Sequence, residues 1–139
     1  MIALDTNVLL RYLLEPLDAR NPSWQAQAAR QIIDQADKVF VSDIVLAELE
    51  WVMESVFELT RSQIAKVFQS VTGNNRFCFE DWSAVQSALM DYRDHKVVDL
   101  SDCLIARRAN SREASTLYTF EGEKKLGGLP VATTLKPPV

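Results

Sequence analysis

Several function classes are excluded by what the 139-residue sequence lacks. It contains only two cysteines, Cys78 and Cys103, and one histidine, His95, so it offers neither a disulfide framework nor the ligand spacing of a zinc site. Its only Gly-Gly pair, Gly127-Gly128, precedes no predicted helix, which disfavours a phosphate-binding loop. The net charge of −4 argues against a protein that coats nucleic acid through many basic contacts, but not against a metal-dependent enzyme that acts on it.

Long apolar runs are missing as well. No stretch has the length and apolar character of a membrane span, and the first residues lack the basic region and cleavage signal of a secretory peptide. Charged residues make up 24% of the chain, a share typical of a folded globular protein. We therefore expect a cytoplasmic protein with reduced cysteines, one domain over residues 1–135 and a frayed tail at residues 136–139.

Short apolar strands alternate with amphipathic helices along the chain. The strands are expected at residues 2–4, 39–41, 77–79, 116–119 and 129–133. The helices are expected at residues 7–14, at 23–36, after Ser42, from Thr60 to Gly73, at 81–94 and from about residue 100, and a loop is expected at 15–22. This alternation is typical of an α/β fold whose mainly parallel sheet is covered by helices on both faces.

Helical spacing also predicts which side chains are buried. Trp24, Ala28, Ile32 and Ile33 are expected to face inward from the helix at residues 23–36, and Trp82 from a later helix. Glu50 falls on the opposite side of its helix from the predicted apolar face, so we expect it on the surface.

An acidic residue follows the first predicted strand directly. Asp5 lies where open α/β sheets build their sites, and Thr6 is the expected N-cap of the next helix. A buried carboxylate at that place needs a compensating charge, for which a cation is the natural candidate. The alternative is that Asp5 only helps to cap the helix, and this segment alone favours neither interpretation.

Three further acidic positions lie where a solvated charge is not the only interpretation. Glu48 borders the expected apolar face of its helix, where it is either a site residue or a flanking charge that reaches water. Asp99 and Asp102 open a helix, where capping and the helix dipole need only one of them. Glu121 follows the fourth predicted strand and is either a site residue or a turn residue.

Taken together, these acids predict a cation site. The carboxyl ends of parallel strands meet at one edge of a sheet, so we expect the carboxylates to converge there. Three or four carboxylates at one place repel each other unless they are protonated or bridged by a cation. Oxygen ligands suit hard ions, so the expected cofactor is Mg²⁺ or Mn²⁺.

Four segments resemble the motifs of PIN-domain ribonucleases, most closely the VapC-like toxins of prokaryotic type II toxin–antitoxin systems. The segments are Ile2-Ala3-Leu4-Asp5-Thr6-Asn7-Val8-Leu9, Val45-Leu46-Ala47-Glu48, Asp99-Leu100-Ser101-Asp102-Cys103-Leu104-Ile105-Ala106 and Thr119-Phe120-Glu121. The resemblance covers nearly the whole chain. It implies a PIN-like three-layer α/β/α sandwich with a short, mainly parallel sheet, a metal-dependent endoribonuclease, a toxin homodimer, and inhibition by a cognate antitoxin protein.

The resemblance also assigns roles to the acidic residues. The family's first acid falls on Asp5, its helical glutamate on Glu48 and its third acid on Asp102, with Asp99 as the accompanying acid. Asp5, Asp99 and Asp102 are thereby implied to bind Mg²⁺ or Mn²⁺. The fourth acid of the family is usually aspartate, so Glu121 departs from the pattern.

Polar and basic residues near these acids are candidates for contacts with RNA. Thr6, Asn7 and Thr119 are candidates for hydrogen bonds to a phosphate or to a metal-bound water. Candidates for guiding the RNA backbone are Arg11, Arg107, Arg108, Lys124 and Lys125, each of which is equally well read as an ordinary surface charge.

Two other functions compete with the ribonuclease. A phosphatase of the haloacid dehalogenase type also begins with a strand and an aspartate, but it needs a second aspartate where this chain has Asn7. A PIN-like domain that has lost catalysis and only binds is favoured by Glu121 and opposed by the retention of Asp5, Glu48 and Asp102. Metal-stimulated cleavage distinguishes the enzyme from the binding module.

Overall fold

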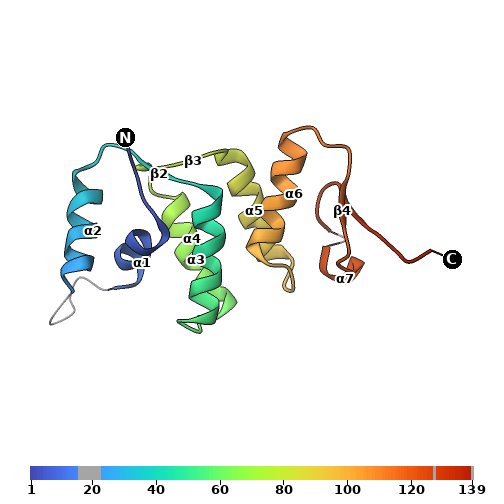
Figure 1. Cartoon of the computed structure of the whole chain (residues 1–139), viewed down its shortest axis with the longest axis horizontal. Coiled ribbons are helices and arrows are strands. Elements are labelled where there is room, and N and C mark those ends of the chain that lie inside the picture. Colours follow the sequence, from blue (N-terminus) through green and yellow to red (C-terminus); the bar gives the residue numbers. More distant parts are fainter. Residues whose placement is uncertain (16–22, 127, 139) are drawn as a thin grey trace. The chain divides into compact units, whose positions relative to one another are not determined.

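The computed structural model describes residues 1–15, 23–126 and 128–138 (Figure 1). The chain divides into two compact units, Met1–Glu80 and Asp81–Val139, which we call the N-terminal unit and the C-terminal unit. Most of the loop predicted at residues 15–22, and the last residue of the predicted tail, lie outside the described residues. The prediction of one domain over residues 1–135 stays a prediction.

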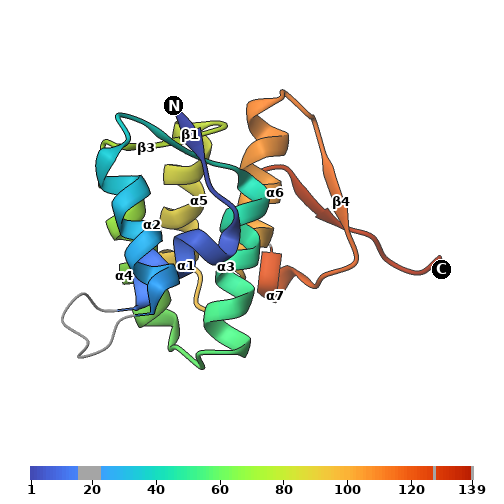
Figure 2. The same cartoon turned by 60° about the vertical axis from the view of Figure 1, so that its left-hand side comes forward.

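The N-terminal unit combines a parallel sheet with the helices that connect its strands. Its elements are β1 (Ile2–Ala3), α1 (Thr6–Leu14), α2 (Trp24–Gln35), β2 (Val39–Val41), α3 (Asp43–Ser55), α4 (Arg61–Thr72) and β3 (Phe77–Phe79). The strands pair in the order β1-β2-β3, and Val39 lies opposite Ile2 on one side and Phe77 on the other. Both crossovers are helical, because parallel neighbours cannot be joined by a tight turn. Figures 1 and 2 show the strands along one edge of this unit, with the helices beside them.

The C-terminal unit is built on a helix pair. Its elements are α5 (Trp82–Asp94), α6 (Leu100–Ser111), β4 (Leu117–Thr119), α7 (Glu123–Leu126) and β5 (Ala132–Thr134). Helices α5 and α6 pack against each other, and β4 pairs with β5. All pairings among the described strands are parallel, as predicted, but they form two sheets where we expected one.

Capping signals read from the sequence are confirmed at two helices. The Ser42 hydroxyl accepts a hydrogen bond from the Val45 amide at 3.2 Å and begins α3. Thr60 and Gln63 form a reciprocal capping box that begins α4. Side-chain oxygens at these positions satisfy amides that have no partner within the helix. Both helices therefore begin where the sequence predicted.

The buried face of α2 differs in part from the predicted one. Ile33 is buried as predicted, together with Ala26 and Ala29, whereas Trp24 and Ile32 are 75% and 51% exposed. The buried residues of α2 therefore follow the spacing i, i+3, i+7 from Ala26, and the larger side chains of Trp24 and Ile32 lie outside this stripe. Small alanines at a helix interface let the partner helix approach closely, and α1 is the helix that packs there.

Two further burial predictions are wrong. Trp82 is 57% exposed, because it lies in the first turn of α5 beyond the buried stripe. Glu50 is only 4% exposed, because it lies one turn from the buried Leu46 and Met53 on the core face of α3.

The two cysteines are free, with Cys103 buried and Cys78 half-buried. Across the described residues, no helix has the length and apolar character needed to cross a membrane.

Candidate functional site

Asp5 caps α1 at the carboxyl end of β1. Its Oδ1 accepts a hydrogen bond from the Val8 amide at 3.1 Å, and its backbone is extended. The helix consequently begins at Thr6, which is 8% exposed, and the prediction that Thr6 is the N-cap is wrong. The Asp5 side chain is exposed, so the cap uses one oxygen of a carboxylate that solvent can still reach. Capping and cation binding are therefore compatible at this residue.

Glu48 lies on a solvent-exposed face of α3. Ile44 and Trp51, one turn away on either side, are 71% and 64% exposed. These three residues recur at helical spacing, so they form one exposed face of the helix. On its other side Glu48 adjoins the buried Val45 and the half-buried Val52, so it does border the apolar face, and its carboxylate is accessible as a site residue requires.

Asp99 and Asp102 flank the first turn of α6. Asp99 occupies the N-cap position, yet within the described part of the chain its side chain makes no capping hydrogen bond. Asp102 lies inside the first turn, where a negative charge is favoured by the helix dipole. The helix start therefore leaves the Asp99 carboxylate available, although capping was its expected alternative role.

A lysine lies between two of the predicted acids. The Lys125 ammonium is 3.8 Å from Asp102 Oδ2 and 3.5 Å from Glu121 Oε1. Burial raises the pKa of Asp102 above its ordinary value, the charges of Asp99 and Glu121 raise it further, and Lys125 acts against them. Burial disfavours the charged Lys125, but Glu121, Asp102 and Asp99 outweigh it and raise the pKa of the ammonium. Asp99, Asp102 and Glu121, which we call the acidic group, thus act on one another within the C-terminal unit.

Two threonines hold the backbone of Glu121 in place. The Thr119 hydroxyl accepts a hydrogen bond from the Glu121 amide at 3.0 Å, and the Thr134 hydroxyl donates one to the Glu121 carbonyl at 2.6 Å. Thr119 was predicted as a supporting residue, whereas Thr134 was missed because it comes from the neighbouring strand β5. The sequence did carry one signal for the lysine, since Glu121 and Lys125 are four residues apart.

The donor chemistry of the acidic group fits a hard divalent cation. All of its donors are carboxylate oxygens, which are the ligands that Mg²⁺ and Mn²⁺ prefer. Within the described residues of each unit, no three His, Cys, Asp or Glu side chains lie close enough together to hold one ion. The acids of the acidic group are thus near enough to act on one another electrostatically. The positive charge beside them is the ammonium of Lys125.

Most of the basic residues predicted to guide RNA already pair with carboxylates. Arg107 donates two hydrogen bonds to Asp91, at 2.7 and 2.8 Å, and joins α6 to α5. Arg108 pairs with Asp81 at 3.2 Å, and Arg11 with Glu15 at 3.0 Å. Lys124 is exposed. Arg107 therefore serves the packing of the helix pair, and the predicted contacts of these basic residues with RNA stay a prediction.

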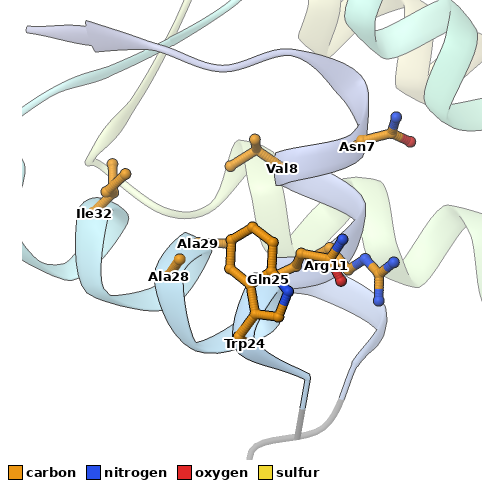
Figure 3. A pocket seen from close by; sticks show the side chains of 8 residues that line it. All are labelled: Asn7, Val8, Arg11, Trp24, Gln25, Ala28, Ala29 and Ile32. Carbon is orange, nitrogen blue, oxygen red and sulfur yellow. The ribbon is translucent and has the colours of Figure 1, made fainter.

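A groove of about 350 Å³ lies between α1 and α2 in the N-terminal unit (Figure 3). It is lined by Asn7, Val8, Arg11, Trp24, Gln25, Ala28, Ala29 and Ile32. Its apolar lining includes the exposed Trp24 and Ile32, and α1 contributes polar side chains at Asn7 and Arg11. An exposed apolar surface with polar neighbours is typical of a place where a partner binds.

The comparison with known proteins agrees with this fold. The profile of the family described as PIN domain matches residues 2–123, which include parts of both units. No curated protein matches the chain. The helices and short parallel strands are consistent with the three-layer α/β/α fold of that family, as predicted. Such domains are generally nucleases, so the match supports a nuclease fold.

Proposed function

We propose that this chain, which belongs to the PIN domain family, is a metal-dependent endoribonuclease that cleaves RNA phosphodiester bonds. The observation that carries the proposal is the acidic group, in which Asp102 and Glu121 share the ammonium of Lys125 and the charge of Asp99 acts on Asp102. Acids that serve only solubility are normally dispersed and hydrated, whereas a half-buried acid with a raised pKa beside other charges, such as Asp102, is typical of functional sites.

Asp5 of the N-terminal unit, and Asp99 and Asp102 of the C-terminal unit, are each proposed as ligands of Mg²⁺ or Mn²⁺, and Glu121 is proposed as a further catalytic acid. When bound, Mg²⁺ or Mn²⁺ lowers the pKa of a bound water and offsets charge on the phosphate. Glu48 accepts a hydrogen bond from the attacking water and orients it. The oxygen of this water forms the new bond to phosphorus, and the water releases a proton to solvent. The bond between phosphorus and the 3′ oxygen breaks, and the 3′ oxygen takes up a proton. The products are a 5′-phosphate and a 3′-hydroxyl.

The neighbouring polar residues have supporting roles in this proposal. Asn7 is exposed beside Asp5 and is proposed to donate a hydrogen bond to a phosphate. Thr6 and Thr119 are proposed to act by positioning, since Thr6 is buried and the Thr119 hydroxyl accepts the Glu121 amide. Lys124 is exposed and is proposed to contact the RNA backbone.

Cleavage of cellular RNA by purified, partner-free protein tests this function. The reaction is run with Mg²⁺, with Mn²⁺ and with EDTA, beside Asp5→Asn, which removes the charge but keeps an N-cap residue. We expect discrete fragments that need the metal and are absent with the variant. Fragments with 5′-phosphate ends would support attack by water. No cleavage by folded protein with either metal would favour the alternative, a catalytically silent PIN-like binding module.

We also propose that the protein is a cytoplasmic toxin that is silenced by a cognate antitoxin. The groove between α1 and α2 supports a protein partner, because it exposes Trp24 and Ile32. An arginine or lysine of the antitoxin would pair with the proposed catalytic acids and compete with the metal. We further propose a homodimer, which sedimentation would detect as a particle of twice the 15.7 kDa chain mass.

Growth of an expressing strain tests the toxin role. Induction of the chain should arrest growth, and co-expression of the neighbouring gene product should restore it. Trp24→Ala should weaken this rescue, while Trp82→Ala, which removes an exposed tryptophan outside the groove, should leave it intact. The toxin proposal fails if the neighbouring product neither binds the protein nor restores growth.

A further inference from the structure

Lys125 is a cation of the chain itself that contacts the predicted metal-binding acids. It lies in the short helix α7, and its ammonium is within 4 Å of carboxylates from two separate elements. Asp102 belongs to α6, and Glu121 follows β4. The same positive charge is therefore shared between an acid assigned to the metal and the acid that departs from the family pattern.

The contacts of Lys125 are looser than the arginine ion pairs of the same unit. Its distances of 3.5 and 3.8 Å exceed the 2.7 Å between Arg107 and Asp91 and the 3.2 Å between Arg108 and Asp81. Lys125 is also 32% exposed, and Glu121 is 50% exposed. An exposed ion pair at such distances contributes little to stability, and a lysine head on a flexible stem can leave it easily. The pairing is therefore of the kind that another cation can displace.

A divalent ion and the Lys125 ammonium would both reduce the repulsion among the carboxylates of the acidic group. Asp99, Asp102 and Glu121 are negative groups that act on Lys125, so removing its charge leaves their repulsion uncompensated. We propose that Lys125 is a built-in counter-cation that occupies Asp102 and Glu121 in the absence of metal, is displaced when Mg²⁺ or Mn²⁺ binds, and thereby sets the affinity for the metal. Lys125 is a positioning residue in this scheme, which rests on the metal dependence in the proposed function.

The scheme also gives Glu121 a purpose that an aspartate would serve less well. Glu121 precedes α7, and its Oε1 lies 3.5 Å from the Lys125 ammonium, so the shorter side chain of an aspartate would leave a wider gap. With the backbone of Glu121 fixed by Thr119 and Thr134, its carboxylate holds the ammonium close to Asp102. The departure from the usual aspartate is thus linked to the presence of the lysine.

The test is the binding of Mn²⁺ alone, measured by titration calorimetry and by the electron paramagnetic resonance of free Mn²⁺. Lys125→Met should bind Mn²⁺ about three- to tenfold more tightly than the unaltered chain, because one or two weak ion pairs no longer compete. Lys96→Met is the matched control. It removes the same charge from an exposed position of the same unit, so its affinity should stay within about twofold.

A second variant keeps the proposal testable if Lys125→Met does not fold. Lys125→Arg retains the charge, and its planar guanidinium binds carboxylates with a fork of donors. It should therefore compete better and weaken Mn²⁺ binding. Equal affinity of the unaltered chain and both Lys125 variants would overturn the inference and leave the metal-dependent function standing. Absence of Mn²⁺ binding by the unaltered, folded chain would overturn both.

Discussion

The two units of the chain differ in their largest buried side chains and in their ion pairs. Nine of the eleven largest fully buried side chains among the described residues belong to the N-terminal unit, where they pack around a parallel sheet. The C-terminal unit contributes only Val98 and Cys103 to that set, but it holds the Arg107–Asp91, Arg108–Asp81 and Lys125 ion pairs. Burial of apolar area is insensitive to pH, whereas charge pairs titrate. The unit that carries the acidic group is thus also the more charge-dependent one.

The proposed acids follow the same division. Asp5 accepts a hydrogen bond from a backbone amide, and Glu48 is exposed. Among the described residues, neither of them pairs with a lysine or an arginine. Asp102 and Glu121 share Lys125 instead. The charge of a proposed ligand can thus be stabilised by a helix N-terminus, as at Asp5, or by a nearby cation, as at Asp102. Only the cation competes with a metal ion for the carboxylate.

Removing a buried ring from the N-terminal unit should have the largest effect. Phe68 is 2% exposed in α4, so Phe68→Ala should cost about 3–5 kcal/mol of unfolding free energy through lost burial and a cavity. Trp24→Ala removes a larger ring that is 75% exposed and should cost far less, about 0.5 kcal/mol. Urea titration followed by circular dichroism measures both. Similar losses for the two variants would show that the burial contrast in this unit is wrong.

Loss of a proposed ligand should reduce cleavage strongly in either unit. Asp102→Asn and Asp5→Asn should each lower the rate of RNA cleavage about a hundred- to a thousandfold, because each removes a charge that holds the ion. Asp94→Asn, at an exposed position of the C-terminal unit, is the control and should retain the rate. Initial rates at saturating Mg²⁺ measure the effect. A loss confined to one unit would mean that the acids of the other have no catalytic role.

Breaking the ion pair between α5 and α6 should destabilise the C-terminal unit. Arg107→Ala leaves the Asp91 carboxylate, which is 6% exposed, without its two hydrogen bonds, so we expect a cost of about 1–3 kcal/mol. Arg112→Ala, at an exposed position after the same helix, should change stability by less than about 0.5 kcal/mol. Chemical unfolding of the two variants measures both losses. Equal losses of unfolding free energy would show that the Arg107–Asp91 pair does not stabilise the unit.

The smallest effects should have opposite signs in the two units. Asp5→Ala removes an N-cap and should cost about 1 kcal/mol in metal-free protein at neutral pH. The pKa of Asp102 is raised in the folded state above its ordinary 3.8, so ionisation of this carboxyl lowers stability. Asp102→Asn should therefore stabilise metal-free protein, by less than about 1 kcal/mol because the side chain is 27% exposed.

The pH dependence distinguishes these two effects. As the pH falls through the folded pKa of Asp102 towards 3.8, the native carboxyl takes up its proton and the advantage of Asp102→Asn should disappear. Thermal unfolding at pH 7 and near pH 4, with metal removed, measures the change. Destabilisation by Asp102→Asn at pH 7 would mean that the Lys125 pair outweighs burial and repulsion.

Much of the local structure could be predicted from the sequence because its signals are local. Ser42, Thr60 and Gln63 begin their helices through hydrogen bonds over three residues, and such bonds need no distant partner. The strand at Val39–Val41 was likewise predicted at its observed bounds from a short apolar run between helical patterns. The positions of the candidate acids after strands and at a helix start followed from the same signals.

The sequence by itself determined the order of elements, the parallel strand pairing and the residues that are candidates for chemistry. Only the tertiary structure decided which stripe of α2 is buried, because periodicity gives a set of faces and the packed neighbour selects one. It also decided that Glu50 is buried and that Arg107 belongs to Asp91. The partner of Lys125 was decided in the same way, since a charge pairs with whatever the fold brings within about 4 Å, and Asp102 lies on a different element.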